Sequence, residues 1–159
     1  MSKSRFITTI FILTLALTAM VSAPAVMAME PSQARVLDIT GEAHFLKAGA
    51  PDWAALQAGM TLSEGDKIKT GKDSEVRIEL AGANKTAEIT VRTASEFTFE
   101  TLRHDKAALL DTTLLNVEVG GVLVKGEKLI GDSKFEVKTP TSIVGIRGTT
   151  FEVYASKAS

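Results

Sequence analysis

Residues 135–153 read FEVKTPTSIVGIRGTTFEV and contain the clearest structural pattern of the chain. Two short runs, residues 135–137 and 151–153, begin and end this stretch, each with a phenylalanine and a valine two positions apart. Because successive side chains of a strand point to opposite faces, each run places its apolar side chains on one face. The stretch therefore predicts two strands that each bury one face.

The chain must turn twice between these two strands. Proline has no N–H for a strand ladder and holds the preceding residue extended, so Thr139 and Pro140 end the first strand. Gly145 and Gly148 bracket the second bend, where glycine permits positive φ or a close backbone approach. Arg147 lies between them and offers five donors in a rigid fork. We therefore predict that Arg147 braces this turn through loop carbonyls or an acidic partner.

These residues also carry a family resemblance. The order Phe-x-Val-x-Thr-Pro, Val-Gly-Ile-Arg-Gly-Thr and Phe-x-Val resembles the closing signature of the FecR domain family. Residues 56–80, LQAGMTLSEGDKIKTGKDSEVRIEL, are similar to its opening pattern of spaced leucines and glycines, a Gly-Asp pair and a Ser-x-Val-x-Ile-x-Leu strand. The resemblance spans roughly residues 36–154. Its closing motif contains Thr139, Pro140, Gly145, Arg147, Gly148 and Thr149.

The resemblance implies a role outside the cytoplasm. In this family a transmembrane regulator typically carries the domain there, receives a signal from an outer-membrane TonB-dependent receptor, and acts on a sigma factor through a cytoplasmic segment. Few residues precede the first apolar run of this chain, so we expect no sigma-regulating segment. The chain ends soon after Val153, so we expect no further receptor-docking domain. The family function that we then expect is partner binding by a stand-alone, exported β domain.

The N-terminus predicts export. Lys3 and Arg5 precede an apolar run, residues 6–21, and small residues follow through residue 28. A basic region, an apolar region and a small-residue site in this order are typical of a secretory signal peptide. We predict that residues 1–28 are removed and that residues 29–159 form one FecR-like domain in the periplasm or cell envelope. If the segment is retained, it is long enough to be an inner-membrane anchor.

Composition excludes several classes of function. The chain has 159 residues and 45% hydrophobic content, enough for one domain with a core. Its 18 basic and 19 acidic residues are scattered, which gives no electrostatic footprint for nucleic acid. Loss of Lys3 and Arg5 would leave 16 basic residues and a net charge of −3. The absence of cysteine excludes disulfides, thiolate metal sites and a lipid-bearing cysteine.

The rest of the chain predicts further strands. Alternating or short apolar runs between turn residues occur at residues 35–39, 43–47, 76–80, 89–91, 97–99, 114–119 and 122–124. Leu56, Leu62 and Ile68 recur every six residues, each with a glycine three positions later, which predicts a coiled, bulged lead-in to the sheet. Residues 81–85 are expected to form a hairpin loop.

Residues 102–110 and the pair Gly120-Gly121 are predicted to interrupt the strands. We predict a loop over residues 102–110, and we expect Gly120-Gly121 to break the strand that runs through residues 114–124. The fold class is therefore all-β, with short, mostly antiparallel strands in one compact domain that is β-helix-like or β-sandwich-like. The core is expected to contain Phe97, Phe99, Phe135, Val137, Phe151 and Val153.

No residue pattern predicts catalysis. His44 and His104, the two histidines, lack the spacing of a zinc pair or a catalytic triad. Gly65-Asp66 and Asp73 lack the spaced ligand series that calcium needs. No glycine-rich loop with its lysine opens a helix for phosphate. We therefore predict no enzyme activity, no cofactor and no metal.

Binding is the remaining class of function. Loop and outer-face residues are what a partner can contact, and Trp53, Arg77 and Arg92 are the candidates. A lone tryptophan near a loop is by itself expected to cover the edge of the core, with stacking on a sugar or a partner peptide as the alternative. The expected partner is another envelope protein, such as a receptor or a membrane signalling protein. The alternatives are an envelope glycan stacked on Trp53 and a structural subunit that pairs its edge strands.

Overall fold

The computed structural model describes residues 29–81, 86–126 and 128–156 of the chain. All regular structure in these residues is β, so the all-β prediction is confirmed. The predicted signal peptide lies outside the described residues, as do residues 82–85 of the predicted hairpin loop.

Short alternating runs become strands wherever one face meets the core. The strands are, in chain order, β1 (Glu30–Pro31), β2 (Gln33–Thr40), β3 (Ala43–Leu46), β4 (Ala54–Ala55), β5 (Thr61–Leu62), β6 (Lys67–Thr70), β7 (Glu75–Ala81), β8 (Thr86–Val91), β9 (Glu96–Asp105), β10 (Leu110–Gly126), β11 (Lys134–Lys138), β12 (Ile143–Ile146) and β13 (Thr149–Ala155). Every run predicted from alternation overlaps one of them.

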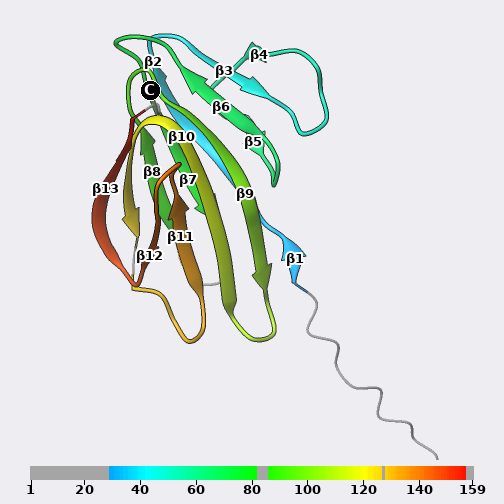
Figure 1. The fold of residues 1–159 in the computed structure, drawn as a ribbon. Helices are drawn as coiled ribbons and strands as arrows, with labels where there is room; N and C mark the ends of the chain where they lie inside the picture. The colour runs from blue at the N-terminus through cyan, green and yellow to red at the C-terminus, as the bar shows by residue number, and fades with distance from the viewer. Residues whose placement is uncertain (1–28, 82–85, 127, 157–159) are drawn as a thin grey trace, which may run out of the picture.

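The strands form a single curled sheet. Its main path runs β4-β3-β6-β9-β10-β8-β7-β2-β5, and β11 and β13 also pair with β10. The neighbours pair antiparallel except β10 and β11, which are parallel. Figure 1 shows the sheet curling around its own interior as a half-barrel. The architecture is thus one continuous curled sheet rather than a β-helix or two separate packed sheets.

The prediction of a loop over residues 102–110 was wrong. β9 continues to Asp105 and β10 begins at Leu110, and these two residues are register partners in a long hairpin. The buried Asp105 closes the turn, because its Oδ1 accepts the N–H groups of Ala107 at 2.8 Å and Ala108 at 2.9 Å. Residues 106–109 do form the turn of this hairpin, so the error lies in the strand residues on either side of it.

The predicted break at Gly120-Gly121 is instead a corner within one strand. Gly120 has φ of 88°, and a β-carbon there would collide with Ser95. The N–H of Gly121 donates to Ser95 Oγ at 2.9 Å, which holds the corner from the neighbouring segment. Before the corner β10 pairs with β9, and after it β10 pairs with β8 and β13. The glycines therefore redirect the strand from one half of the curled sheet to the other.

The core fills the interior of the curl. Phe97 and Phe99 are fully buried and meet edge to face, with ring centroids 5.0 Å apart. Phe135 and Val137 are also buried, and Phe151 packs against them from β13. Val153 is partly buried against the same cluster. The predicted core is confirmed, and each fully buried large side chain contributes about 1.5–3 kcal/mol of hydrophobic stabilisation.

The glycine period leads the chain into the sheet as predicted. Gly59 and Gly65 have φ of 85° and 88° at the turns before β5 and β6. The apolar positions of the period are all buried, and they are Leu56, Leu62 and Ile68. Positive φ reverses the chain at short intervals, so each apolar side chain returns to the interior.

Candidate functional site

The closing motif folds into a hairpin, β11–β12, followed by β13. Between the first two strands, the N–H of Thr139 donates to the Ser142 carbonyl at 2.8 Å. The Ser142 N–H donates in turn to Thr139 Oγ1 at 3.1 Å. Pro140 sits at the tip, where its missing N–H costs no ladder bond. The predicted end of the first strand at Thr139 and Pro140 is confirmed, since β11 ends at Lys138.

The second bend joins β12 to β13. Gly148 has φ of 89°, as a tight reversal requires, and β13 begins at Thr149. Gly145 lies within β12, and a β-carbon there would meet nothing within 4 Å. Arg147 is exposed and makes no hydrogen bond or ion pair with any described residue. The structure therefore gives no support to the predicted brace.

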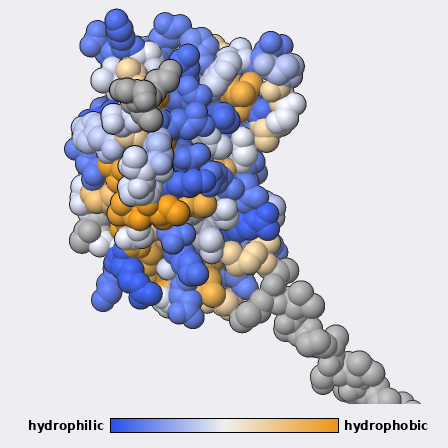
Figure 2. Space-filling model, in the orientation of Figure 1, coloured by the Kyte–Doolittle hydropathy of each residue, from blue (hydrophilic) through white to orange (hydrophobic). Residues whose placement is uncertain are grey.

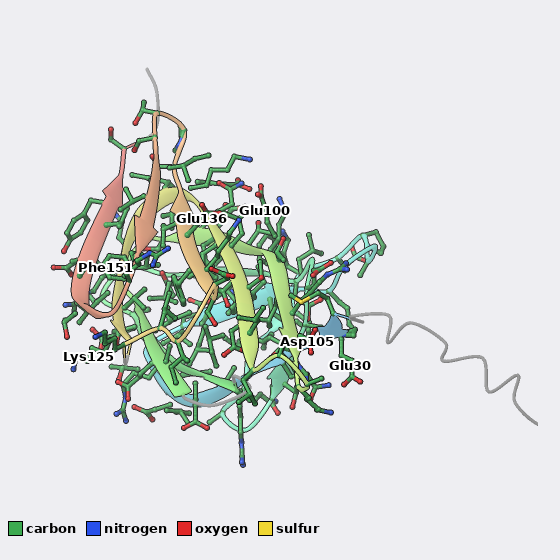
Figure 3. The ribbon with its side chains drawn as sticks, turned by 90° about the horizontal axis from the view of Figure 1, so that it is seen from below. Glu30, Glu100, Asp105, Lys125, Glu136 and Phe151 are labelled. Atoms are coloured by element: carbon green, nitrogen blue, oxygen red, sulfur yellow. The ribbon has the colours of Figure 1, made fainter. Side chains whose placement is uncertain are left out.

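A groove of about 540 Å³ lies between β12 and β13. Figure 2 shows hydrophobic surface gathered at the left of the molecule, over this region. Figure 3 shows β12 and β13 side by side at one margin of the sheet, with Phe151 on β13. The groove is lined by Val144, Gly145, Ile146, Arg147, Phe151, Glu152, Val153 and Tyr154. Half of these residues have apolar side chains on the core-facing side of their strands. The apolar interior of the sheet therefore extends into the groove.

The core-facing side of β12 follows from its register. Val144 pairs with the buried Val137, and Ile146 pairs with Phe135. Directly opposite residues of an antiparallel pair share one face, so both β12 side chains point the same way as the core residues. Phe135 also meets Phe151 of β13 edge to face, at 6.4 Å between ring centroids. The aromatic contact closes the interior beneath the groove.

β12 leaves one backbone edge open. It pairs only with β11 in the part of the chain that the structure describes. Thr139 and Ser142 are a hydrogen-bonded pair, and such pairs alternate along an antiparallel ladder. The backbone of Val144 therefore faces β11. The N–H and C=O groups of Ile143 and Gly145 face the other way, toward the open edge.

β13 leaves a second, longer edge open. Among the described strands it pairs only with β10. On the opposite side of β10, the Arg92 N–H donates to the Gly121 carbonyl at 2.8 Å, which fixes the alternation of the ladder. The residues of β13 whose backbone groups face away from β10 are then Thr150, Glu152 and Tyr154. Two open edges thus flank one apolar groove.

The charges at the groove differ in whether they are already paired. Arg92 donates to Glu152 at 2.9 Å and to Glu75 at 2.9 Å. Glu152 also accepts the Tyr154 hydroxyl at 2.9 Å. The hydrogen bond from Arg92, followed by that from Tyr154, holds the pKa of Glu152 below its usual value of 4.5. Glu152 is therefore ionised and neutralised, whereas Arg147 remains an exposed cation on the same groove.

The predicted binding residues do not gather at one place. Arg77 pairs with Asp38 at 3.5 Å, on the outer face of the sheet. Trp53 lies in the loop before β4 with 38% of its surface exposed, so neither residue lines the groove. Arg92 reaches the groove only through its ion pair with Glu152. The structure brings one of the three predicted residues near the candidate site.

Sequence reasoning missed Tyr154. Tyr154 is 69% exposed, and its side chain lies on the face of β13 opposite to Phe151 and Val153. Alternation after Val153 would have placed it on the outer face, and it is the one tyrosine of the chain. No sequence signal gives its position against Gly121, its register partner on β10.

Buried Asp66 has a structural role. Its Oδ1 accepts the Ala48 N–H at 2.9 Å and its Oδ2 accepts the Ser63 N–H at 2.9 Å. Lys47 lies 3.6 Å from the same carboxylate. Each oxygen of the carboxylate thus accepts a backbone N–H, and Lys47 lies close enough to balance its charge. The Gly-Asp pair of the family pattern ties two loops together.

The histidines lie apart, each beside a glutamate. His44 Nε2 is 3.6 Å from Glu42, and His104 Nε2 is 3.6 Å from Glu30. Among residues 29–81, 86–126 and 128–156, no three potential ligands gather where they could hold a metal ion. The same residues contain no helix of the length and apolarity that a membrane span requires.

Comparison with protein families identifies the class of protein. The family model described as FecR protein matches residues 66–159, more than half of the chain. The chain belongs to the FecR family. The matched region begins at Asp66 and includes the whole β11–β13 unit, whereas residues 56–65 of the opening pattern lie before it. No curated protein and no solved structure was found to be similar to the chain.

Proposed function

We propose that this protein is a non-catalytic, exported FecR-domain module that binds another protein of the cell envelope in signalling or sensing. The observation that carries the proposal is the groove between β12 and β13, where two open strand edges flank an apolar surface. Exposed edges and apolar patches in one place are typical of protein interaction sites. Membership of a family associated with envelope signalling supports the same role.

The partner is expected to be a receptor or a membrane signalling protein. The groove lies within the segment that matches the family model, so the shared part of the domain supplies the binding surface. Ile143, which precedes the lining residue Val144 on β12, is 64% exposed, a large fraction for an isoleucine in a strand. Covering it with a partner would remove apolar surface from water at about 25 cal/mol per Å².

Site-specific photocrosslinking in living cells tests this function. A photoreactive amino acid replaces Ile143 of β12 in one strain and Ile130 in another, because Ile130 is similarly exposed at 52% but belongs to neither strand that forms the groove. We expect discrete protein adducts from position 143 only. Equal adducts from both positions, or none from position 143, would contradict the proposal.

Glycan binding is the second candidate function. Trp53 is 38% exposed in a loop, and aromatic faces of this kind stack on sugars. Retention of the purified protein on peptidoglycan, lost in Trp53→Ala and kept in Arg147→Gln, would assign the binding role to this loop. Retention that is absent or unchanged in Trp53→Ala would remove the candidate.

A further inference from the structure

The groove could accept an additional β-strand, because both of its walls have open strand edges. Its two walls are β12 and β13, and each wall has backbone N–H and C=O groups without a neighbouring strand among the described residues. The outward groups are those of Ile143, Gly145, Thr150, Glu152 and Tyr154, by the alternation of the two ladders. Unpaired edges of this kind are templates for pairing with another chain.

We propose that the groove binds an extended segment of a partner protein as an added β-strand, with alternating apolar side chains and a carboxylate that pairs with Arg147. This inference rests on the proposed function, because it names the chemistry of the partner at the same surface. Strand addition takes its affinity from main-chain hydrogen bonds and its specificity from pockets for alternate side chains.

The apolar side of the segment is set by the groove. Ile146 from one wall and Phe151 and Val153 from the other pack against the core, and the exposed Val144 lies on the same face of β12 as Ile146. An added strand would place every second side chain on this surface. Five residues of β13, from Thr150 to Tyr154, extend over roughly 15 Å at about 3.3 Å per residue, so a segment of five or six residues fits.

The charge of the segment is set by Arg147. Glu152 is the carboxylate of the groove lining, and it is held by Arg92 at 2.9 Å and by the Tyr154 hydroxyl at 2.9 Å. Arg147 has no such partner among the described residues, so the site offers one unmatched positive charge. A guanidinium pairs best with a carboxylate, in a two-bond fork. A second copy of this chain would bring the same already neutralised Glu152, so an acidic segment of another protein fits better.

Binding of synthetic peptides to the purified protein tests the charge. Immobilised eight-residue peptides alternate valine or isoleucine with threonine and carry glutamate, glutamine or lysine at one threonine position. We expect glutamate peptides to bind on the order of tenfold more tightly than lysine peptides. Arg147→Gln should remove this preference and Arg147→Glu should reverse it. Arg77→Gln is the matched control, because this exposed arginine lies outside the groove, and it should change nothing.

The same peptides test strand addition. Methylation of alternate backbone nitrogens removes donors while keeping every side chain, so we expect it to abolish binding. Amide hydrogen exchange should slow at the outward residues of β12 and β13 when the peptide binds. Binding that survives methylation, with no slowing at these amides, would overturn strand addition.

Other outcomes also decide the inference. A lack of binding by all the peptides, or equal binding of glutamate and lysine peptides, would overturn it. Dimerisation of the protein that competes with the peptides and is lost in Arg147→Glu would assign the groove to a second copy and overturn it as well. If the peptide tests fail but crosslinked adducts form from position 143 in cells, the proposed function stands without strand addition. If the peptide tests fail and no adducts form, both the proposed function and strand addition are rejected.

Discussion

The ring of Tyr154 lies against Gly121 on the neighbouring strand: a β-carbon at Gly121 would come within 2.5 Å of Tyr154 Cε1. The two residues are direct register partners of β13 and β10. A glycine opposite an aromatic residue leaves a backbone surface that the ring can cover. Gly121 therefore fixes the position of Tyr154 on the rim of the groove.

Replacement of Gly121 tests this relationship. Gly121→Ala should destabilise the protein by about 1–3 kcal/mol, because the added methyl displaces the ring. The cost should largely vanish in a Tyr154→Ala background, which a double-mutant cycle measured by urea unfolding would show. Gly126→Ala, on the same strand with nothing within 4 Å of its β-carbon, is the control and should be close to neutral. An equal cost in both backgrounds would place the strain elsewhere.

Core and loop aromatics should differ in stability. Phe97 is fully buried against Phe99, so Phe97→Ala should cost about 3–5 kcal/mol through lost burial and a cavity. Trp53 is 38% exposed, and Trp53→Ala should cost less than about 1 kcal/mol. Urea unfolding of the two variants checks the difference. Similar losses would move Trp53 into the core and remove it as a glycan candidate.

Acid sensitivity should depend on Glu64. Hydrogen bonding to Arg103 is the largest cause that lowers the pKa of Glu64 from 4.5, and the Leu102 N–H adds to it. A carboxyl whose folded pKa lies below its unfolded value stabilises the fold fully above about pH 4.5. That stability is lost as pH falls through the lower folded pKa. Thermal unfolding at pH 6 and pH 3 should show that the melting temperature falls less between these pH values in Glu64→Gln than in the natural protein.

A matched control exists for this pH effect. Arg77 and Asp38 form an exposed pair at 3.5 Å, which is longer than the two bonds of 2.9 and 2.8 Å between Arg103 and Glu64. Asp38→Asn should therefore leave the fall in melting temperature between pH 6 and pH 3 nearly unchanged. An equal effect of both substitutions would mean that general charge, rather than the Glu64 contact, governs acid stability.

Export should remove the N-terminal segment. The basic, apolar and small-residue order of residues 1–28 predicts cleavage before Met29. Mass spectrometry of the protein from the envelope fraction is expected to find Met29 as the first residue. Detection of intact residues 1–28 would instead support the anchored form.

Much of the fold could be predicted from local alternation. In β7, polar residues alternate with the buried Val76, Ile78 and Leu80. This alternation at every second residue predicts the strand directly. The parallel pairing of β10 with β11 could not be predicted, because register between distant strands leaves no local pattern. The corner at Gly120 was missed for a similar reason, since it depends on contact with Ser95, a residue 25 positions earlier.

The candidate site could be predicted only in part. The alternation of Phe151 and Val153 gave the apolar side of β13, and the proline gave the end of β11. Which strand edges remain open is a property of the whole sheet, so no single stretch contains it. The role predicted for Arg147 was unsupported because five donors do not indicate whether any acceptor lies within reach.

The shared strand β10 also sets an order of assembly. β2, β7 and β8, all from the first part of the chain, lie side by side and pair antiparallel, whereas β11 and β13 have no sheet to join until β10 is in place. A chain synthesised from its N-terminus thus completes the groove last. The surface proposed to recognise a partner exists only once the rest of the domain has folded, so binding there would report that folding is complete.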